Sequence, residues 1–288
     1  METTTLRGSW RSKTASEFRE IGDKSLILSP ILVFEHELSR IIGTMIELNR
    51  IYNEDNLATL ARMEDNSIDL VVTSPPYNKS FYNTGADKSV WKGRNIDYDL
   101  FGDAMEPAEY EAWQRKILSE CLRVLKPSGS IFYNHKDILH KQQTVHPKWV
   151  YDFPLKQIII WDRKSSCTID PHYFMPANEW VFWIVKDKDK TFFDKDKAIY
   201  RTNIWQMNVE KNPHPAPFPM TFSNNCVVTC CPEGGIVYDP FMGSGTTAMS
   251  VLKVGGGRKY IGSEISDKYV EMAEKRLKIE NMQMNLFE

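Results

Sequence analysis

The strand predicted by residues 67–72 runs directly into two consecutive prolines. These residues, Ser-Ile-Asp-Leu-Val-Val, are mostly apolar and have the length of a strand that is buried on both faces in a parallel sheet. Pro75 and Pro76 cannot continue a hydrogen-bonded ladder, so the chain must leave the sheet there. The sequence therefore predicts a sharp turn, Thr73-Ser74-Pro75-Pro76-Tyr77-Asn78, at the carboxyl end of a buried strand.

Further strand-length runs alternate with helical patterns along the 288 residues. A chain of this length can form one large α/β domain with insertions. Strands that alternate with helices are typical of a doubly wound, mostly parallel sheet, and this α/β class is the fold that we predict. The predicted strands are 50–52, 67–72, 130–134, 157–161, 178–185, 236–238 and 260–262, and the predicted helices are 31–48, 57–63, 107–125, 226–231, 246–254 and a last one that includes Leu277.

Polar and cysteine-containing segments lie between or within these elements. Residues 79–104 are rich in Gly, Asn and Asp and predict a long functional loop. Residues 186–197 alternate Lys and Asp and predict a solvated hairpin. Cys226, Cys230 and Cys231 are predicted to be buried helix cysteines, because no second spaced pair follows that would complete a zinc site.

Composition and charge exclude several classes of protein. The chain is 42% hydrophobic and 26% charged, which excludes a disordered chain. Its net charge of -2 excludes a uniformly basic nucleic-acid binder, so any nucleic acid must contact a local basic face. Charges interrupt the apolar stretch 26–48, and the first 25 residues lack an apolar core, so neither a membrane span nor a signal peptide is expected. Five cysteines, an odd number, favour a reducing interior.

A glycine-rich turn lies between a predicted strand and a predicted helix at residues 239–248. Its pattern Gly243-x-Gly245-x-x-Ala248 fits a nucleotide-binding turn, in which the helix N-terminus offers backbone N–H groups to a ligand. Glu264 follows at the end of the next strand, where a carboxylate can accept both hydroxyls of a ribose. A nucleoside triphosphate is disfavoured, because threonine and not lysine follows Gly245. NAD and S-adenosylmethionine both remain compatible with this turn.

The Ser-Pro-Pro-Tyr turn combines hydrogen-bond acceptors with an aromatic face. The fixed φ of both prolines directs the Ser74 hydroxyl and the Pro75 carbonyl, and Tyr77 lies beside them in the sequence. This combination suits a planar heterocycle with an exocyclic amino group. The lone pair of such an amine is delocalised into the ring. Two acceptors outside the ring plane would favour a tetrahedral nitrogen that can attack a sulfonium methyl group without a covalent enzyme intermediate.

Together these motifs resemble those of the β-group amino DNA methyltransferases of bacteria and phages, which modify cytosine N4 or adenine N6. The resemblance covers about residues 50–280 and includes the motif order, with the catalytic turn first and the glycine turn last. It implies the Rossmann-like fold of S-adenosylmethionine-dependent methyltransferases in a circularly permuted order. It also implies that the two turns lie on adjacent strands at the switch point of the sheet.

The resemblance implies roles for the residues that match the family's motifs. The catalytic residues would be Ser74, Pro75, Pro76 and Tyr77, and the target base would flip out of the duplex into their pocket. The cofactor would be S-adenosyl-L-methionine. Asp55 matches an acid near the cofactor's adenine but fits a helix cap equally well, and both interpretations stay open. The cofactor-binding residues would be Asp55, Asp239, Phe241, Gly243, Ser244, Gly245, Thr246, Thr247, Glu264, His214 and Phe218.

The resemblance also divides the chain into four parts. Residues 1–48 would form an N-terminal arm and helix, 49–162 the catalytic half, 163–211 a target-recognition insertion and 212–288 the cofactor-binding half. A serine at the start of the catalytic turn favours cytosine N4 as the target, with adenine N6 as the alternative. Basic side chains are expected to contact double-stranded DNA. The predicted contacts are Lys79, Arg94, Arg163, Lys164 and Arg201.

Two other classes of function compete with a site-specific DNA methyltransferase. A non-catalytic protein that binds S-adenosylmethionine or DNA would not need an intact Ser-Pro-Pro-Tyr turn, and an NAD-dependent oxidoreductase would leave that turn unexplained. The resemblance implies a restriction-modification enzyme in the cytoplasm of a bacterial or phage-infected cell, associated with the nucleoid. It allows a cognate restriction endonuclease and a homodimer as partners, and it requires neither a metal nor a membrane. Residues 283–287 resemble a peptide that binds sliding clamps, but a frayed tail is the favoured interpretation.

Overall fold

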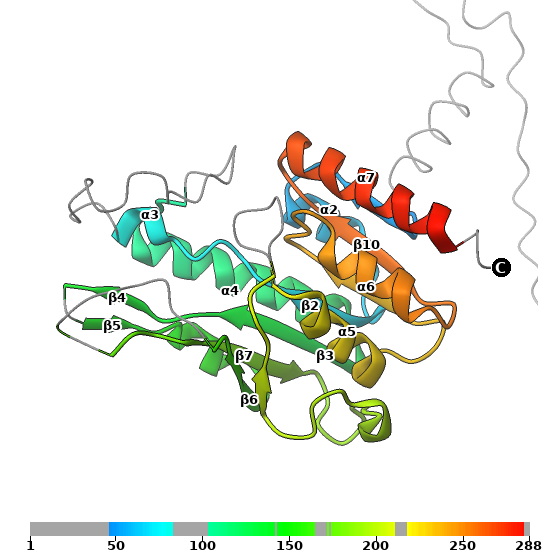
Figure 1. Cartoon of the computed structure of the whole chain (residues 1–288). Helices are drawn as coiled ribbons and strands as arrows, with labels where there is room; N and C mark the ends of the chain where they lie inside the picture. Colours follow the sequence, from blue (N-terminus) through cyan, green and yellow to red (C-terminus); the bar gives the residue numbers. More distant parts are fainter. Residues whose placement is uncertain are drawn as a thin grey trace, which may run out of the picture. The chain divides into compact units, whose positions relative to one another are not determined.

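A sheet of eight strands forms the centre of the described part of the chain (Figure 1). The computed structural model describes residues 46–82, 103–141, 143–164, 172, 174–210 and 218–284. In sheet order the strands are β1 (Arg50–Tyr52), β10 (Lys259–Ser263), β9 (Ile236–Asp239), β2 (Ile68–Thr73), β3 (Leu125–His135), β7 (Asn178–Val185), β6 (Leu155–Asp162) and β8 (Ile204–Gln206). The first five run parallel to one another, β7 is antiparallel to β3 and β6, and β8 is parallel to β6. The predicted doubly wound, mostly parallel sheet is confirmed.

Helices cover both faces of this sheet. Leu70 and Val72 of β2 belong to one apolar core, which also contains residues of α5, α6 and α7, whereas Val71 belongs to a second core with residues of α2 and α4. Because both faces of β2 are buried, this strand is mostly apolar. The helices are α2 (Asn56–Arg62), α3 (Lys79–Tyr82), α4 (Pro107–Val124), α5 (Met220–Cys230), α6 (Thr246–Val254) and α7 (Asp267–Met284), with 3₁₀ turns at Lys148–Asp152 and Lys195–Lys197 and a small pair of strands, β4 (Ile138–His140) and β5 (Gln143–Val145).

The chain leaves β9 and β2 in opposite directions. From β9 it continues through α6 to β10 on one side, and from β2 it continues through α4 to β3 on the other. The two strands are parallel neighbours, with Leu70 opposite Val237. The predicted switch point is therefore present, and both turns follow the carboxyl ends of adjacent strands.

Several predicted elements are confirmed with their bounds. Strand 178–185 and helix 246–254 match β7 and α6 residue for residue. Cys226 and Cys230 are buried in α5 and Cys231 is buried at its end, as predicted, and burial raises the pKa of the Cys230 thiol to about 12. None of the helices in the described ranges combines the length and the apolar character that a bilayer crossing requires.

Two predicted segments need correction. β3 begins at Leu125 and not at residue 130, because Leu125 already pairs with Ile68. Residues 186–197 are not a hairpin, since the backbone N–H of Phe192 bonds to the Ser128 carbonyl at 2.9 Å and that of Asp194 bonds to a carbonyl of α5 at 2.8 Å. The segment is therefore attached to its neighbours and does not pair with itself. Of the predicted loop 79–104, residues 79–82 form α3 and 83–102 lie outside the described residues, as do residues 31–45 of the first predicted helix.

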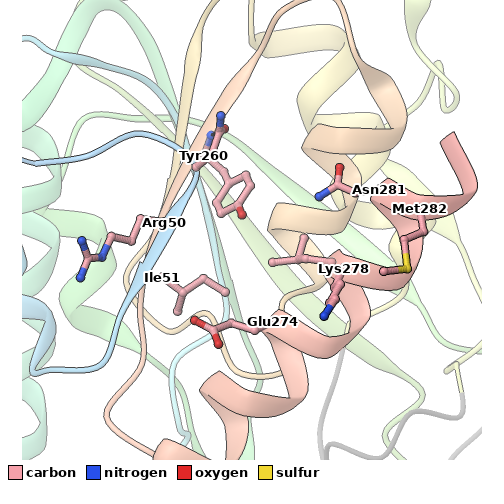
Figure 2. A pocket seen from close by; sticks show the side chains of 9 residues that line it. Arg50, Ile51, Tyr260, Glu274, Lys278, Asn281 and Met282 are labelled. Carbon is pink, nitrogen blue, oxygen red and sulfur yellow. Dashed lines mark hydrogen bonds between the residues drawn. The ribbon is translucent and has the colours of Figure 1, made fainter. Parts of the chain in front are cut away.

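A cavity of about 400 Å³ lies between the edge strand β1 and helix α7 (Figure 2). Arg50 and Ile51 line it from β1, Tyr260 lines it from β10, and Glu274 and Lys278 line it from α7. None of the predicted catalytic, cofactor-binding or DNA-contact residues lines this cavity. It is thus separate from the site at the two turns.

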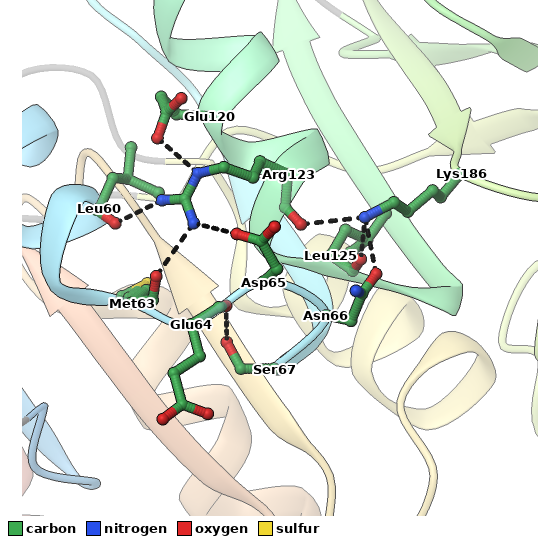
Figure 3. Close-up of polar contacts among 10 residues, drawn as sticks. All are labelled: Leu60, Met63, Glu64, Asp65, Asn66, Ser67, Glu120, Arg123, Leu125 and Lys186. Carbon is green, nitrogen blue, oxygen red and sulfur yellow. Dashed lines mark hydrogen bonds and ion pairs between the residues drawn. The ribbon is translucent and has the colours of Figure 1, made fainter.

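Arg123 connects the end of α4 through hydrogen bonds with the end of α2 and the segment between α2 and β2 (Figure 3). Its guanidinium donates to the carbonyls of Leu60 and Met63 at 2.7 and 3.0 Å and to the Asp65 carboxylate at 2.6 Å. Lys186, just after β7, donates to the Arg123 carbonyl at 2.9 Å. These contacts hold the amino-terminal end of β2, at the opposite end of the strand from the catalytic turn, so their role is structural.

Candidate active site

A cavity of about 190 Å³ lies where the two turns meet. Ser74 and Pro76 line it from the catalytic turn, and Phe241 and Gly243 line it from the glycine turn. Two chain segments that are remote in sequence therefore share one cavity, as predicted, but Pro75 and Tyr77 of the catalytic turn are buried and do not line it. The other lining residues are Glu54, Asp55, Asn56, Met105, Trp113, Pro240, Ser263, Glu264, Ile265 and Tyr269.

The glycine turn is held from behind by α7. Gly243 and Gly245 have φ angles of 52° and 84°, in the left-handed region that favours glycine. A Cβ added at Gly245 would lie 2.9 Å from the Cβ of Ala273. Arg276 donates to the carbonyl oxygen of Ser244 and, at 3.0 Å, to its hydroxyl. Close packing against α7 thus fixes the conformation of the turn.

Glu264 reaches the glycine turn from the end of β10. One carboxylate oxygen accepts the backbone N–H of Gly243 at 2.8 Å, and the other accepts that of Ser266 at 3.0 Å. Glu264 also lines the cavity. A carboxylate at this place in the cavity wall is an acceptor that suits the hydroxyls of a ligand.

Asp239 lies beneath the two turns and not in the cavity wall. Its carboxylate accepts hydrogen bonds from the hydroxyls of Thr73 and Thr247, at 2.8 and 2.6 Å, and from the backbone N–H of Phe241 at 3.0 Å. Burial raises the pKa of Asp239 to about 6, and these hydrogen bonds oppose the rise. Asp239 and Thr247 therefore connect the turns. Four further predicted cofactor residues are also absent from the cavity wall: Ser244, Gly245, Thr246 and Phe218.

The segment before α5 carries two of the predicted cofactor residues. His214 lies outside the described residues. Phe218 is buried in the apolar core and packs against Phe222 of α5, with 5.0 Å between ring centroids. In the described arrangement, Phe218 supports α5.

Asp55 has surroundings that agree with both of its interpretations. It is the N-cap of α2, where its carboxylate accepts the backbone N–H of Leu57 at 2.8 Å, and it also lines the cavity. The neighbouring Asn56 donates to the Pro240 carbonyl at 3.2 Å. Its side-chain oxygen is buried and has no hydrogen-bond partner among the described residues. A ligand in the cavity could supply the missing donor.

Part of the cavity wall is apolar and was not predicted. Trp113 of α4 meets Phe241 edge-on, with 5.6 Å between ring centroids. Met105 precedes α4, and Tyr269 lies in the first turn of α7. Trp113 follows Tyr110 at helical spacing, so in the sequence it resembles a core residue. Only the packing of α4 beside the glycine turn reveals its position.

A polar cluster surrounds the hydroxyl of Tyr77. Ser74 Oγ lies 2.7 Å from this hydroxyl, which donates to Glu179 at 3.1 Å. The amide nitrogen of Asn134 lies 2.7 Å from the Tyr77 hydroxyl, 2.9 Å from Glu179 Oε2 and 3.3 Å from Ser74 Oγ. Asn134 is on β3 and Glu179 is near the start of β7, so neighbouring strands bring these groups together. Sequence reasoning missed both, because each lies inside a strand pattern and outside any motif.

Tyr110 and His135 hold the backbone of the catalytic turn. The Tyr110 hydroxyl donates to the Pro76 carbonyl at 2.7 Å and lies 3.0 Å from His135 Nε2. Burial lowers the pKa of His135 to about 3, so its ring is neutral at pH 7. His135 Nδ1 lies 2.9 Å from both the backbone nitrogen and the carbonyl oxygen of Lys136. The His135 ring also lies against Tyr77, with 4.8 Å between centroids.

The predicted DNA-contact residues have different surroundings. Lys79 lies over the Tyr77 ring, 5.3 Å from its centroid, and desolvation together with the charge of Lys136 lowers the pKa of Lys79 to about 7. Arg163 donates to Glu179 at 3.0 Å and so belongs to the polar cluster. Of the other predicted contacts, Lys164 and Arg201 are exposed and Arg94 lies outside the described residues.

Similarity to known proteins extends over most of the chain. The sequence model of a family described as DNA methylase matches residues 68–275. The type II methyltransferase M.BglII of Bacillus subtilis is 31% identical, over 83% of this chain and 72% of its own length. The DNA adenine methyltransferase YhdJ of Escherichia coli (strain K12) is 26% identical, over 81% of this chain and 84% of its own length.

A solved structure has the same fold. The PvuII DNA methyltransferase, which is described as cytosine-N4-specific, matches with a TM-score of 0.61. The match covers 84% of this chain and 94% of that protein, at 20% sequence identity. At this level of identity, the likeness establishes the arrangement of strands and helices.

Proposed function

Since the chain belongs to the family of DNA methylases, we propose that it transfers a methyl group from S-adenosylmethionine to the exocyclic amino group of a base in double-stranded DNA. The cavity shared by the two turns is the observation that carries this proposal. A methyl donor against Phe241 and Gly243 would meet an amine held at Ser74. Both substrates could then lie in one site with their reacting atoms in contact.

The residues on the glycine-turn side fit S-adenosylmethionine. The Glu264 carboxylate offers acceptors to the ribose hydroxyls, and the unpartnered oxygen of Asn56 and the carboxylate of Asp55 offer acceptors to amino groups. Phe241 and Trp113 provide an apolar wall for the adenine. When bound, the cofactor supplies a methyl group on a positively charged sulfur. Among the predicted cofactor residues that stay out of the cavity wall, Asp239 and Thr247 would support the turn.

On the other side of the cavity, Ser74 and Pro75 would hold the target amine. The Ser74 hydroxyl and the Pro75 carbonyl would accept its two hydrogens outside the plane of the base, so the nitrogen becomes tetrahedral and its lone pair faces the methyl carbon. The bound cofactor would supply the methyl group, the Ser74 hydroxyl and the Pro75 carbonyl would hold the nitrogen that receives it, and the proton released from this nitrogen would pass to solvent. Tyr77 would stack on the base, which must first leave the duplex at a cost of about a few kcal/mol.

Cytosine N4 is the proposed target, and adenine N6 is the second candidate. Both are amines conjugated to a ring, so the same pair of acceptors serves either. Ser74 at the start of the catalytic turn favours cytosine in the family resemblance. The adenine alternative is supported by the relative YhdJ, which is named an adenine methyltransferase.

Transfer of labelled methyl groups to DNA of varied sequence tests this function. The wild type is expected to label duplex DNA, and Tyr77→Ala to lower the rate roughly 100-fold, because the stacking face and the hydroxyl beside Ser74 are both lost. Hydrolysis of the product to nucleosides identifies the methylated base. Binding of S-adenosylmethionine without transfer would instead support a non-catalytic protein, and binding of NADH would support an oxidoreductase.

We further propose that DNA contacts the loops of residues 163–211. Lys164 and Arg201 are exposed there and could reach phosphates, and Arg94, which lies outside the described residues, is proposed to do the same. Lys79 and Arg163 would act nearer the flipped base, since both adjoin the polar cluster. The same part of the chain supplies β7 and β8 to the sheet, so this segment would both recognise DNA and form part of the fold. A cognate endonuclease, a homodimer and a cytoplasmic location remain proposals from the family resemblance.

A further inference from the structure

We infer that Glu179 fixes the direction of the hydrogen bonds around Tyr77, so that Ser74 faces the target base only as an acceptor. The inference rests on the proposed function, because it concerns the amine that is methylated. Glu179 is 7% exposed, and its carboxylate contacts Tyr77, Asn134 and Arg163. It would act through Ser74 and is therefore a positioning residue.

A count of the available protons gives these directions. An ionised carboxylate can only accept, so the Tyr77 hydroxyl, 3.1 Å from Glu179, must donate to it. Tyr77 has one hydroxyl proton, so in its 2.7 Å contact with Ser74 the serine must be the donor. With its proton directed at Tyr77, the Ser74 oxygen has only lone pairs to offer to the cavity that it lines.

Asn134 supports the same arrangement. Its amide nitrogen has two protons and three neighbours, and the shorter contacts are those with Tyr77 at 2.7 Å and Glu179 at 2.9 Å. The contact with Ser74, at 3.3 Å, is the weakest, so the serine keeps a lone pair. The opposite orientation of the amide would place its oxygen against the carboxylate. Arg163 balances the charge of Glu179 from the other carboxylate oxygen, at 3.0 Å.

This arrangement has a consequence for specificity. A free serine hydroxyl can either donate or accept, so by itself it does not distinguish an amino group from a carbonyl. Fixed as an acceptor, Ser74 can accept a hydrogen bond from an amine. A carbonyl oxygen in the same place would face a lone pair of Ser74 and be repelled by it. The pocket would therefore prefer cytosine to uracil, or adenine to hypoxanthine, because each pair differs in this group.

The variant Glu179→Gln tests the inference. Arg163 favours the amide oxygen of the new side chain, so the amide nitrogen would face Tyr77 and donate to it. Tyr77 would then lose the carboxylate that takes its proton, so the Ser74 hydroxyl would no longer be restricted to the role of donor to Tyr77 and could present its proton to the cavity. We expect the single-turnover rate of methyl transfer to fall roughly 100-fold, with S-adenosylmethionine affinity within about twofold of wild type. Glu179→Asp keeps a carboxylate and is expected to retain more activity than Glu179→Gln.

Competition by a modified duplex separates this role from a structural one. The competitor carries a carbonyl in place of the amino group of the target base, in a sequence that the wild type methylates. The wild type should bind the amino duplex about tenfold more tightly than the competitor, and Glu179→Gln should narrow or reverse this ratio. An unchanged ratio, or equal transfer rates in the two proteins, would overturn the inference. Failure of the wild type to methylate any DNA is measured separately and would contradict the proposed function itself.

Discussion

At the scale of single residues, Asp239 is the buried carboxylate that links the catalytic turn to the glycine turn. Its folded-state pKa is raised to about 6, whereas an unfolded aspartate ionises near pH 4. Between these values the folded protein binds a proton that the unfolded chain has released. The contribution of Asp239 to stability is therefore fully present below about pH 4 and is lost as the pH rises through 6, by on the order of 3 kcal/mol.

Asp239→Asn removes this titration while keeping the shape of the side chain. We expect the free energy of unfolding of the wild type, relative to that of the variant, to decrease between pH 4.5 and pH 7. Urea unfolding of both proteins at the two pH values measures this difference, and the other titrating groups cancel in the comparison. A difference that does not change with pH would show that Asp239 ionises normally in the folded protein.

At the scale of elements, the start of α6 depends on its contact with α7. Gly245→Ala would place an L-residue at a φ of 84° and its Cβ 2.9 Å from that of Ala273. Gly234→Ala is the matched control, because Gly234 has a φ of 72° and no atom within 4 Å of an added Cβ. The control should cost about 1–2 kcal/mol from backbone strain, and Gly245→Ala about 1–3 kcal/mol more from overpacking. If urea unfolding shows equal losses of unfolding free energy in the two variants, α7 can move away from the added methyl group at no cost in free energy.

Elements were predictable where a local signal dominated. Residues 180–185 form a continuous apolar and aromatic run, and glycines just before Thr246 mark the start of α6, so β7 and α6 were located without error. The hairpin predicted for residues 186–197 was wrong because their hydrogen-bond partners, Ser128 and Thr229, are remote in sequence and produce no pattern within the segment itself. The early start of β3 has the same cause, since Leu125 pairs with Ile68 across the sheet.

At the scale of the whole molecule, the sequence located the parts of the site that form contiguous motifs. Ser74 and Gly243 each lie in such a motif, and the family resemblance implied that the two motifs lie at neighbouring strand ends, as the structure has them. Trp113, Asn134 and Glu179 come from α4, β3 and β7, where each fits an ordinary helix or strand pattern. Their place in the site follows from the packing of separate elements, which periodicity does not encode.

The central pairing of β2 with β9 joins the first half of the chain to the second, so a ligand at their carboxyl ends should stabilise the entire sheet. S-adenosylmethionine at 100 times its Kd is expected to raise the free energy of unfolding by about 2.7 kcal/mol, in a single transition. Glu264→Gln removes one charged acceptor and one of two backbone hydrogen bonds, so at the same concentration it should show a smaller increase. Thermal unfolding followed by circular dichroism and by tryptophan fluorescence measures both effects. Separate transitions, only one of which moves with the cofactor, would mean that the cofactor binds one half of the chain and that the paired turns do not form its site.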